Sequence, residues 1–511
     1  MAEVSRPAIF RAVDATTGAE LEPAYASSSL EDVNTACEAA EAAFDAYRET
    51  DGHKRAAFLE TIAEEIVALG DALLKRAHQE TGLPLARLTG ERGRTVTQLR
   101  LFADLVKSGL WRGVRIDPEE PDRSPFPRPD LRLRMVPLGP VAVFGASNFP
   151  LAFSTAGGDA ASALAAGCPV VVKGHPAHPG TDIMVAEAIQ TAVRRTGMPQ
   201  GTFGHIRGPG NELGAALVRD PRIAAVGFTG SRAGGLALMR LGQAREIPIP
   251  VYAEMSSINP IIILPGALAS RGGQLGGEFV QSLTLGAGQF CTNPGLVLAI
   301  DGPGLELFIQ NATAALAKHE PQPMLTGGIR EAYARGASAL HANPAVNVLA
   351  SGLEGDGIAR EMAQFFATDA GAFLADPALG DENFGASSLL VRCANVEELR
   401  AVVVRLEGQL TITLQMEDED LDPARALLPL LERKAGRVLA NGWPTGVEVT
   451  HAMVHGGPYP ATSDGRSTSV GTLAIDRFLR PVCYQDLPAE LLPIELRDGA
   501  EVPRLVDGKP A

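Results

Sequence analysis

The sequence predicts an α/β protein with two parallel sheets and a separate β arm. Three features lead to this prediction: short apolar runs alternate with helical patterns from residue 140, the alternation resumes after residue 260, and a strand-like segment at 131–135 precedes both. Buried parallel strands are nearly continuous apolar runs, whereas half-exposed strands alternate between apolar and polar residues. A length of 511 residues leaves room for about three structural units.

The first hundred residues predict a helical layer. Ser29 and Asp32 have the spacing of a capping box, and apolar residues follow at helical intervals in runs that end near Gly109. A proline-rich connection at 118–130 leads to 131–135, where Leu and Met alternate with Arg. We interpret this strand as part of a protruding arm used in assembly, and an ordinary surface hairpin is the alternative.

The first predicted sheet lies between residues 141 and 253. Its strands are expected at 141–144, 169–172, 223–228 and 251–253, and its helices at 151–166, 180–196 and 231–243. Parallel sheets bind ligands beyond the carboxyl ends of their strands. The loops at 145–148, 173–179 and 229–231 are therefore the places where we expect a cofactor.

The second predicted sheet contains the most informative cysteine of the chain. Its strands are expected at 260–264, 297–300, 410–414 and 438–440, and its helices at 305–318, 395–406 and 423–435. Cys291 follows a glycine-rich loop, after the apolar helical face of Leu275, Phe279 and Leu283. A thiol in that place has the features of a nucleophile. A buried cysteine with a packing role is the alternative.

The composition is that of a globular protein that does not bind nucleic acid. Hydrophobic residues make up 45% of the chain, and 45 basic against 60 acidic residues give a net charge of −15. A phosphate backbone would require a basic surface instead. No apolar stretch approaches the ~20 residues that cross a bilayer, and no secretory signal is expected at the amino terminus. We therefore expect no membrane partner.

The cysteines and histidines predict neither disulfides nor a metal site. The five cysteines (Cys37, Cys168, Cys291, Cys393 and Cys483) are scattered and odd in number. This pattern is untypical of a disulfide framework and favours a reducing cytoplasm. The chain has no CxxC pair, and its nine histidines show no metal-ligand spacing on an evident helix.

Polar residues stand where the predicted strands end. Lys173 has the reach to donate to the hydroxyls of a nucleotide ribose, and residues 228–231 end a strand and open a helix whose free N–H groups favour a phosphate. Glu254 on an apolar strand end has the features of a general base, and the amide of Asn148 is a donor for an oxyanion. Each has a plainer alternative: a surface lysine, a helix N-cap, a solvated glutamate and a turn asparagine.

The joint order of these segments resembles the aldehyde dehydrogenase family over residues 25 to 485. The motifs that carry the resemblance are Asn148-Phe149-Pro150, Val172-Lys173, Phe228-Thr229-Gly230-Ser231, Glu254, Gln289-Phe290-Cys291 and Glu382-Asn383-Phe384-Gly385. The resemblance implies an aldehyde dehydrogenase-like α/β fold, with a parallel Rossmann-type cofactor sheet, a second α/β catalytic domain and a β oligomerisation arm. The implied division is a cofactor-binding domain at 1–117 and 138–252, a catalytic domain at 253–450, and an arm at 118–137 and 465–490.

The resemblance also implies a role for each motif. Cys291 is the nucleophile, Glu254 the general base and Asn148 the oxyanion donor. The implied cofactor is NADP or NAD, and the residues that bind it are Lys173, His175, Thr229, Gly230, Ser231, Glu382 and Phe384. Pro176 stands where many NAD-preferring relatives have a glutamate, so no carboxylate there would repel a 2′-phosphate. His175 or His178 is then available to hold that phosphate.

Within the family, residues 173–179, 286–295 and 455–462 resemble the branch that oxidises 2-oxoglutarate semialdehyde (2,5-dioxopentanoate) to 2-oxoglutarate. The alternative is NADP-dependent oxidation of medium- or long-chain aliphatic aldehydes. A third possibility is a cofactor-free thiol hydrolase or a non-catalytic binder on the same fold. The leading interpretation implies a small-molecule aldehyde substrate and a cytoplasmic homodimer or homotetramer.

Two further expectations concern the carboxyl-terminal region. Residues 468–475 are expected to form a strand that pairs with 131–135, as the family's oligomerisation arm does. His451 and His455 have i, i+4 spacing, but the Gly-Gly-Pro run after them breaks any helix. We interpret both as loop histidines near the substrate mouth and not as metal ligands.

Overall fold

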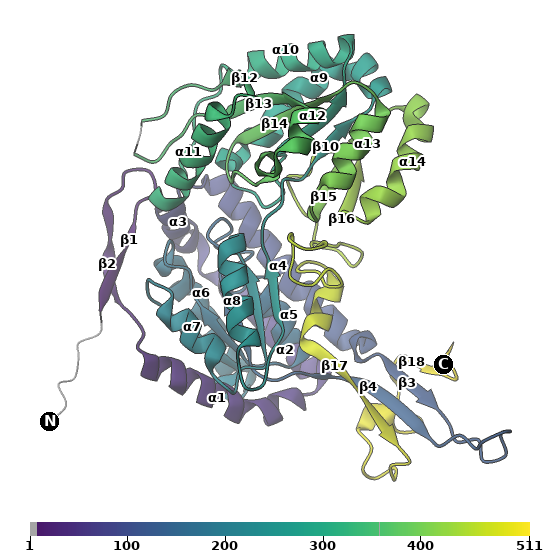
Figure 1. The fold of residues 1–511 in the computed structure, drawn as a ribbon. Helices are drawn as coiled ribbons and strands as arrows, with labels where there is room; N and C mark the ends of the chain where they lie inside the picture. The colour runs from purple at the N-terminus through teal and green to yellow at the C-terminus, as the bar shows by residue number, and fades with distance from the viewer. Residues whose placement is uncertain (1–7, 357) are drawn as a thin grey trace.

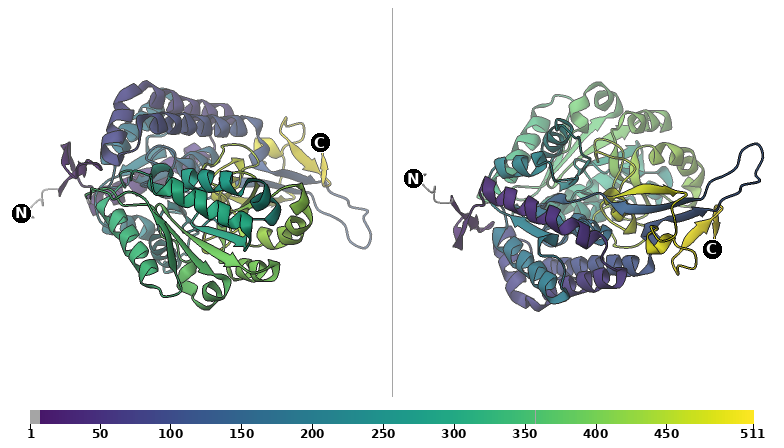
Figure 2. Two further views of the ribbon diagram at one scale, coloured as in Figure 1. Left: turned by 90° about the horizontal axis from the view of Figure 1, so that it is seen from above. Right: turned by 90° about the horizontal axis from the view of Figure 1, so that it is seen from below.

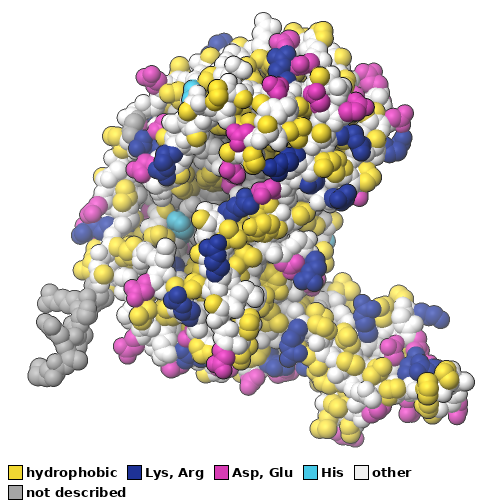
Figure 3. Space-filling model, viewed as in Figure 1, with side chains coloured by type: hydrophobic (Ala, Val, Ile, Leu, Met, Phe, Trp, Pro, Cys, Tyr) yellow, Lys and Arg dark blue, Asp and Glu magenta, His cyan; other side chains and the backbone are white. Residues whose placement is uncertain are grey.

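Two lobes and a projecting arm make up the protein (Figure 1). The structure is a computed structural model that describes residues 8–356 and 358–511. A hairpin that the sequence did not predict, β1 (Ile9–Val13) and β2 (Glu20–Ala26), stands on the side opposite the arm (Figure 2). The surface is hollowed between the two lobes (Figure 3).

The lower lobe in Figure 1 contains a five-stranded parallel sheet in the order β7-β6-β5-β8-β9. Its strands are β5 (Val141–Phe144), β6 (Val170–Lys173), β7 (Phe203–Ile206), β8 (Ala225–Thr229) and β9 (Val251–Glu254). Four of them lie at the predicted places, whereas β7 was missed because its Phe-Gly-His-Ile sequence is not an apolar run. The loops after β5, β6, β8 and β9 meet at one edge of the sheet, because parallel strands end together.

Helices cover this sheet, and the predicted helical layer is confirmed. They are α1 (Leu30–Arg48), α2 (Gly52–Ala68), α3 (Gly70–Thr81), α4 (Leu85–Ser108), α5 (Gly158–Ala166), α6 (Pro179–Thr196), α7 (Glu212–Arg219) and α8 (Arg232–Gln243). The capping box before α1 forms as predicted: Ser29 Oγ accepts from the Asp32 N–H at 3.1 Å, and Asp32 Oδ2 accepts from the Ser29 N–H at 2.7 Å.

The helix predicted at 151–166 is shorter than expected. It begins only at Gly158, and the seven residues before it form turns. The main-chain N–H groups of Leu151 and Ala152 donate to Oε1 of Glu91, at 2.8 and 3.1 Å. These donors are therefore committed to a side chain of α4 and not to a local helix.

The upper lobe contains a seven-stranded sheet in the order β12-β13-β14-β11-β10-β15-β16, parallel except for the edge strand β12. Its strands are β10 (Ile261–Ile263), β11 (Leu296–Ile300), β12 (Asn347–Ser351), β13 (Gln364–Asp369), β14 (Ser387–Cys393), β15 (Gln409–Gln415) and β16 (Ala435–Ala440). Its helices are α9 (Pro265–Thr284), α10 (Pro303–Leu316), α11 (Gly327–Ala342), α12 (Ala370–Ala375), α13 (Val396–Arg405) and α14 (Leu421–Glu432). The four predicted strands are present, and β12, β13 and β14 were missed.

Both faces of each sheet are buried. Val170 and Val172 pack into one apolar cluster of the lower lobe, and Val171 between them packs into another. In the upper lobe Ile261 and Ile262 likewise belong to different clusters. This double burial explains why the strands are continuous apolar runs in the sequence. Among the residues that the structure describes, no helix is long and apolar enough to span a bilayer.

The arm is a five-stranded sheet in the order β17-β4-β3-β18-β19. Its strands are β3 (Val114–Asp117), β4 (Leu131–Pro137), β17 (Leu479–Gln485), β18 (Arg504–Val506) and β19 (Lys509–Pro510). The strand predicted at 468–475 is wrong: residues Thr472–Phe478 form a 3₁₀ helix, and β17 is the partner of β4. Thr468 accepts a hydrogen bond from the main-chain N–H of His455, and this contact holds the segment in a loop that packs against His455.

Candidate active site

Cys291 lies in a loop between α9 and β11 whose shape depends on glycine. Gly288 has a φ of +69°, and a Cβ there would lie 2.3 Å from the main chain of Gly385. The amide of Asn259 donates to the main-chain oxygens of Cys291 and Asn293, both at 2.9 Å. The thiol is half-buried, at a position fixed by these main-chain contacts.

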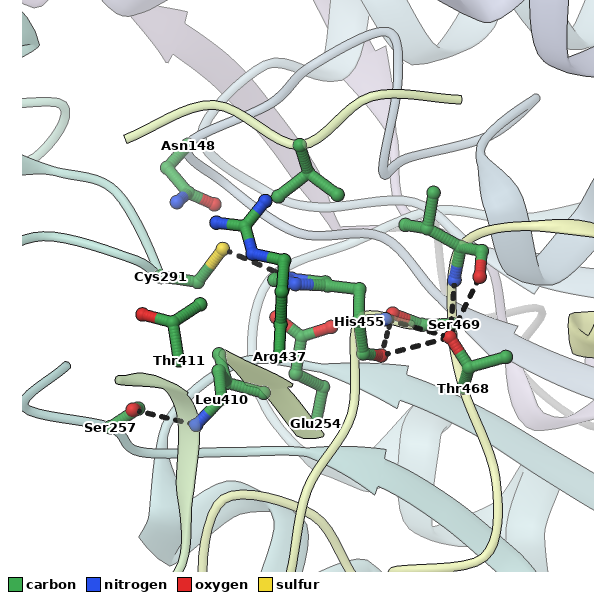
Figure 4. Close-up of polar contacts among 12 residues, drawn as sticks. Asn148, Glu254, Ser257, Cys291, Leu410, Thr411, Arg437, His455, Thr468 and Ser469 are labelled. Atoms are coloured by element: carbon green, nitrogen blue, oxygen red, sulfur yellow. Dashed lines mark hydrogen bonds and ion pairs between the residues drawn. The ribbon is translucent and has the colours of Figure 1, made fainter. Parts of the chain in front are cut away.

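The thiol meets a histidine and a carboxylate (Figure 4). Glu254 ends β9, and its Oε1 lies 2.9 Å from Nε2 of His455, while its Oε2 accepts from Ser469 Oγ at 2.8 Å. The same Nε2 lies 3.3 Å from Sγ of Cys291. Because an ionised carboxylate only accepts hydrogen bonds, we assign the proton on Nε2 to the histidine. One imidazole N–H therefore faces both the carboxylate and the sulfur.

His455 does not lie at the mouth of the site, so that expectation is wrong. The residue is 1% exposed, whereas His451 is on the surface. Its main-chain N–H donates to Thr468 Oγ1 at 2.8 Å, and its Nδ1 is buried without a partner. A Cβ on Gly456 would lie 2.4 Å from the Ser467 oxygen. The glycine pair after His455 was thus the sequence signal of close packing.

The donor atoms of Glu254, Cys291 and His455 lie within 4.8 Å of one another, a spacing that a metal ion can bridge. Hydrogen-bond contacts link the histidine to both other residues, and these account for the proximity without an ion. That the protein uses no metal stays a prediction.

The electrostatics separate the carboxylate from the thiol. Burial acts to raise the pKa of Glu254, but the interactions with His455 and Ser469 outweigh it, so its pKa is lowered. Burial, together with the charge of Glu254, raises the pKa of the Cys291 thiol well above its ordinary value. At neutral pH an ionised carboxylate therefore stands beside a protonated thiol. Attack by the sulfur requires loss of that proton and a donor that stabilises the thiolate.

Asn148 follows β5 and joins the two lobes at the site. Its Nδ2 donates to the main-chain oxygen of Gln289 at 3.1 Å, and its own main-chain oxygen accepts from Arg87 Nη2 at 2.8 Å. In Figure 4 the amide points toward the same space as the thiol of Cys291. An amide N–H so placed is a donor for an oxyanion on a carbon bound to the sulfur.

The predicted cofactor residues Lys173 and 229–231 lie along the carboxyl edge of the lower sheet. Lys173 Nζ donates to the main-chain oxygens of Gly208 and Gly174, at 2.7 and 3.1 Å, which uses two of its three N–H bonds. Ser231 Oγ accepts from the Gly234 N–H at 3.2 Å, so the expected N-cap of α8 is present. Helix N-termini of this kind also bind phosphates.

Gly230 connects this turn to Glu254. Its main-chain N–H donates to the main-chain oxygen of Glu254 at 3.1 Å. Thr229 and Glu254 are also paired in the register of β8 and β9. The cofactor edge and the general-base candidate therefore share one strand pair.

His178 cannot hold a 2′-phosphate, and this suggestion is wrong. The side chain is fully buried, its Nε2 lies 2.9 Å from the main-chain oxygen of Ala146, and its Nδ1 lies 3.3 Å from Oδ2 of Asp182. His175 is half-buried, and its Nδ1 accepts from the Ala177 N–H at 3.2 Å. Only His175 of the two keeps a ring nitrogen available to a ligand.

Glu382 and Phe384 come from the upper lobe. They line a small cavity together with Ser257, Phe290 and Asn293. Burial raises the pKa of Glu382 to about 8; a hydrogen bond from the Ser257 N–H opposes this shift, and the charge of Glu254 adds to it. Asn148, Glu254 and Cys291 therefore lie together at one site, and Glu382 is close enough for its pKa to be affected by the charge of Glu254.

Comparison with known proteins agrees with this geometry. A family model described as "Aldehyde dehydrogenase family" matches residues 5–325. The chain belongs to the aldehyde dehydrogenase family. Alpha-ketoglutaric semialdehyde dehydrogenase 2 of Azospirillum brasilense is 58% identical over 502 residues, which cover 98% of this chain and 96% of the relative. Alpha-ketoglutaric semialdehyde dehydrogenase of Acinetobacter baylyi is 49% identical over 487 residues, which cover 95% and 92%.

Solved structures confirm the predicted fold of this aldehyde dehydrogenase. The glyceraldehyde-3-phosphate dehydrogenase of Methanocaldococcus jannaschii, solved with NADP, superposes with a TM-score of 0.79 at 19% sequence identity. The superposition covers 94% of this chain and 99% of the other. The α/β prediction with a parallel cofactor-type sheet is therefore confirmed. The division into domains by residue stays a prediction.

Three arginines of α4 and β16 that approach Cys291 were not predicted from the sequence, and neither was the place of His455 beside the thiol. Arg87, Arg94 and Arg437 lie close enough to interact with the charge of Cys291. Arg87 and Arg94 are seven residues apart on α4, a spacing that places them on one helix face. That spacing is visible in the sequence, but nothing in the sequence says which segment the face meets.

Proposed function

We propose that this aldehyde dehydrogenase oxidises 2-oxoglutarate semialdehyde to 2-oxoglutarate, with NADP or NAD as the hydride acceptor. The observation that carries the proposal is the contact of Cys291 with His455 and of His455 with Glu254, beside the amide of Asn148. The names of the two relatives, similar over nearly their whole length, support the choice of substrate.

The first step is attack on the aldehyde carbon by Cys291 as a thiolate. The half-buried thiol releases its proton to water, and the N–H on Nε2 of His455, 3.3 Å from the sulfur, then donates to the thiolate. The amide of Asn148 and the main-chain N–H of Cys291 donate to the oxygen that becomes negative during attack. The product is a thiohemiacetal on Cys291.

The second step is oxidation of the thiohemiacetal to a thioester. A bound nicotinamide dinucleotide supplies the hydride acceptor for it. Three features of the chain fit such a cofactor: a free N–H on Lys173, the accessible helix N-terminus at 229–231, and the half-buried carboxyl of Glu382. We assign Lys173 and Glu382 to the ribose hydroxyls, Thr229, Gly230 and Ser231 to the phosphates, and Phe384 to the nicotinamide ring.

The third step is hydrolysis of the thioester. Glu254 is ionised because its pKa is lowered, and His455 and Ser469 fix the orientation of its carboxylate. It takes a proton from the attacking water as the water adds to the thioester carbon. Collapse releases the carboxylic acid and restores the sulfur of Cys291.

The cofactor preference, the assembly and the location complete the proposal. Pro176 offers no carboxylate against a 2′-phosphate, and the half-buried His175 lies beside it, so we propose that NADP is accepted. We propose a homodimer or homotetramer that uses the arm sheet. A cytoplasmic location agrees with the five free cysteines among the residues that the structure describes.

The substrate is tested by the absorbance of reduced nicotinamide with the purified enzyme. We expect a higher kcat/KM for 2,5-dioxopentanoate than for hexanal. A hexanal preference above about tenfold would favour the aliphatic-aldehyde alternative. Thioester or ester hydrolysis without any nicotinamide reduction would favour the cofactor-free hydrolase.

The cofactor assignment has its own test. Pro176→Glu places a carboxylate where it would repel a 2′-phosphate, and we expect it to lower kcat/KM for NADP by about tenfold with little change for NAD. If the wild-type enzyme shows no activity with NADP at saturating aldehyde, acceptance of NADP is refuted.

A further inference from the structure

Two arginines from different lobes reach the site that holds Cys291. Arg94 belongs to α4 in the lower lobe, and Arg437 belongs to β16 in the upper lobe. In Figure 4 the guanidinium of Arg437 lies beside the amide of Asn148 and the thiol of Cys291. The charges of Arg94 and Arg437 are close enough to influence each other as well as Cys291.

Both arginines are fixed by the same loop. Arg437 Nη1 and Nη2 donate to the main-chain oxygens of Gly446 and Pro444, at 2.9 and 2.7 Å, and Arg94 Nη1 donates to that of Val447. The guanidinium of Arg94 also stacks over the ring of Phe153, 5.2 Å from its centroid. Neutral carbonyls and an aromatic ring thus hold the two cations in place.

Neither cation has a carboxylate partner among the residues that the structure describes, where no Asp or Glu oxygen lies within 4.0 Å of Arg94 or Arg437. Nε and Nη2 of Arg94 and Nε of Arg437 are buried without hydrogen-bond partners. The charges of Glu91, Glu448 and Glu254 act on Arg94, but none of these carboxylates is in direct contact with it, and Oε1 of Glu91 accepts from two main-chain N–H groups. Arginine keeps its charge even when burial disfavours it, so two adjacent cations without a carboxylate in direct contact are costly in the free protein.

We propose that Arg94 and Arg437 form the subsite for the carboxylate at the 2-oxo-acid end of the substrate, whose aldehyde end lies at Cys291. The inference rests on the proposed function and deepens it. Guanidinium groups match a carboxylate with parallel N–H donors, and the ligand's carboxylate supplies the direct ionic partner that both arginines lack. Arg94 also covers a face of Phe153 that an alkyl chain would otherwise contact. The pair thereby selects oxo-acid aldehydes over alkyl aldehydes of the same length.

The test compares 2,5-dioxopentanoate with pentanal, an uncharged aldehyde of the same chain length. In Arg94→Met and Arg437→Met we expect the ratio of kcat/KM values, oxo acid over pentanal, to fall by about tenfold to a hundredfold, mainly through the KM of the oxo acid. Arg94→Lys and Arg437→Lys keep the positive charge but lose the planar arrangement of N–H donors. Their ratio of kcat/KM values should lie between that of the wild type and that of the Met variants. Arg100→Met, on the exposed side of α4, is the matched control and should leave the ratio unchanged.

The ratio of the two kcat/KM values remains informative even if a variant loosens the loop at 444–447. Arg437 also holds the carbonyls at 444 and 446, so Arg437→Met can lower both activities. A parallel loss with an unchanged ratio in both Met variants overturns the subsite.

A second readout needs no turnover. Glutarate should protect Cys291 of the wild type from alkylation by iodoacetamide, and protection should disappear in both Met variants. Protection that persists in both overturns the subsite. If the wild type oxidises pentanal but not 2,5-dioxopentanoate, the proposed function is wrong. The protection experiment then still tests whether Arg94 and Arg437 bind a carboxylate, because it does not depend on turnover.

Discussion

Asp182 with His178, and Glu254 with His455, are two buried pairs of a carboxylate and a histidine. The nearest atoms are 3.3 Å apart in the first pair and 2.9 Å in the second. The first pair is closed: Asp182 Oδ1 also accepts from two hydroxyls, and the other ring nitrogen of His178 contacts a main-chain oxygen. The second is open, because the nitrogen of His455 that meets Glu254 also faces a half-buried thiol.

The two pairs differ in what their charges do. Burial works against the charge on His178, but Asp182 outweighs it and raises the pKa of His178 to about 9. Burial likewise works against the charge on Asp182, but His178 outweighs it and lowers the pKa of Asp182 to about 2. This pair is a permanent ion pair at neutral pH that holds the loop before Asn148. At the second pair, burial and then the charge of Glu254 raise the pKa of Cys291, so here the carboxylate acts on a thiol as well as on its histidine.

Removal of the thiol should have the largest effect. Cys291→Ala should abolish aldehyde oxidation and leave nucleotide binding intact, because the residues proposed to bind the cofactor lie on other segments. Absorbance of reduced nicotinamide and calorimetric titration with NADP measure the two properties. Persistent turnover would contradict the whole assignment.

Glu254→Gln should separate the first turnover from the later ones. We expect one burst of reduced nicotinamide and then a rate about a hundredfold below the wild type, because no base activates water. Loss of the negative charge should also lower the pKa of Cys291, so iodoacetamide should alkylate the thiol faster at pH 7. A uniformly slow first turnover with slower alkylation would show instead that Glu254 activates the thiol.

His455→Ala should slow the first turnover itself. The variant removes the N–H donor from the sulfur, and we expect alkylation of Cys291 and the burst rate to fall by about tenfold or more. His455→Gln restores an N–H and should recover part of the rate. Alkylation of His455→Ala at the wild-type rate would mean that the contact does not stabilise the thiolate.

At the closed pair, substitution should reduce stability more than chemistry. Asp182→Asn leaves the charge of His178 without its counter-ion, and we expect the midpoint of thermal unfolding to fall by about 5 °C or more. Alkylation of Cys291 should keep its rate to within about threefold, since the thiol does not touch this pair. A stability equal to that of the wild type would contradict the description of a buried ion pair.

The pH dependence of stability should give the smallest effect. His178 has a raised pKa, so its contribution is complete below its ordinary pKa of 6.5 and is lost as the pH rises through about 9. Asp182 has a lowered pKa, so its contribution is complete above 3.8 and is lost as the pH falls through about 2. Thermal unfolding between pH 6 and pH 10 should therefore decline more steeply in the wild type than in His178→Gln. Parallel curves would contradict the shift.

The sequence predicted the features of the fold and site that depend on local patterns. Strands β5, β6, β8 and β9 were visible because residues buried on both faces are continuously apolar, and Lys173 and Glu254 followed as the residues that end two of them. The missed residues depend on contacts between distant segments. His455 lies 164 residues from Cys291 in the chain, in a loop without a regular period.

Two errors had the same origin. The segment at 468–475 has strand-like composition, but the hydroxyl of Thr468 accepts a hydrogen bond from the main-chain N–H of His455. The turns at 151–157 have helical composition, but a glutamate of α4 takes two of their N–H groups. In both cases a tertiary hydrogen bond overrode the local preference, and no pattern within the segment reveals its partner.

The hydrogen bond from the Gly230 N–H to the Glu254 main-chain oxygen connects the turn proposed to bind the cofactor with the residue proposed to activate water. The carboxylate of Glu254 contacts His455 and is the proposed base, while the main-chain oxygen of Glu254 accepts from the turn proposed to bind the cofactor phosphates. If the turn binds the nucleotide as proposed, a shift of the turn on binding is transmitted through this hydrogen bond to the main chain of Glu254. We therefore expect binding of the cofactor to affect the position of Glu254. Variants of the turn at 229–231 should be assayed for the rate of thioester hydrolysis as well as for nucleotide affinity.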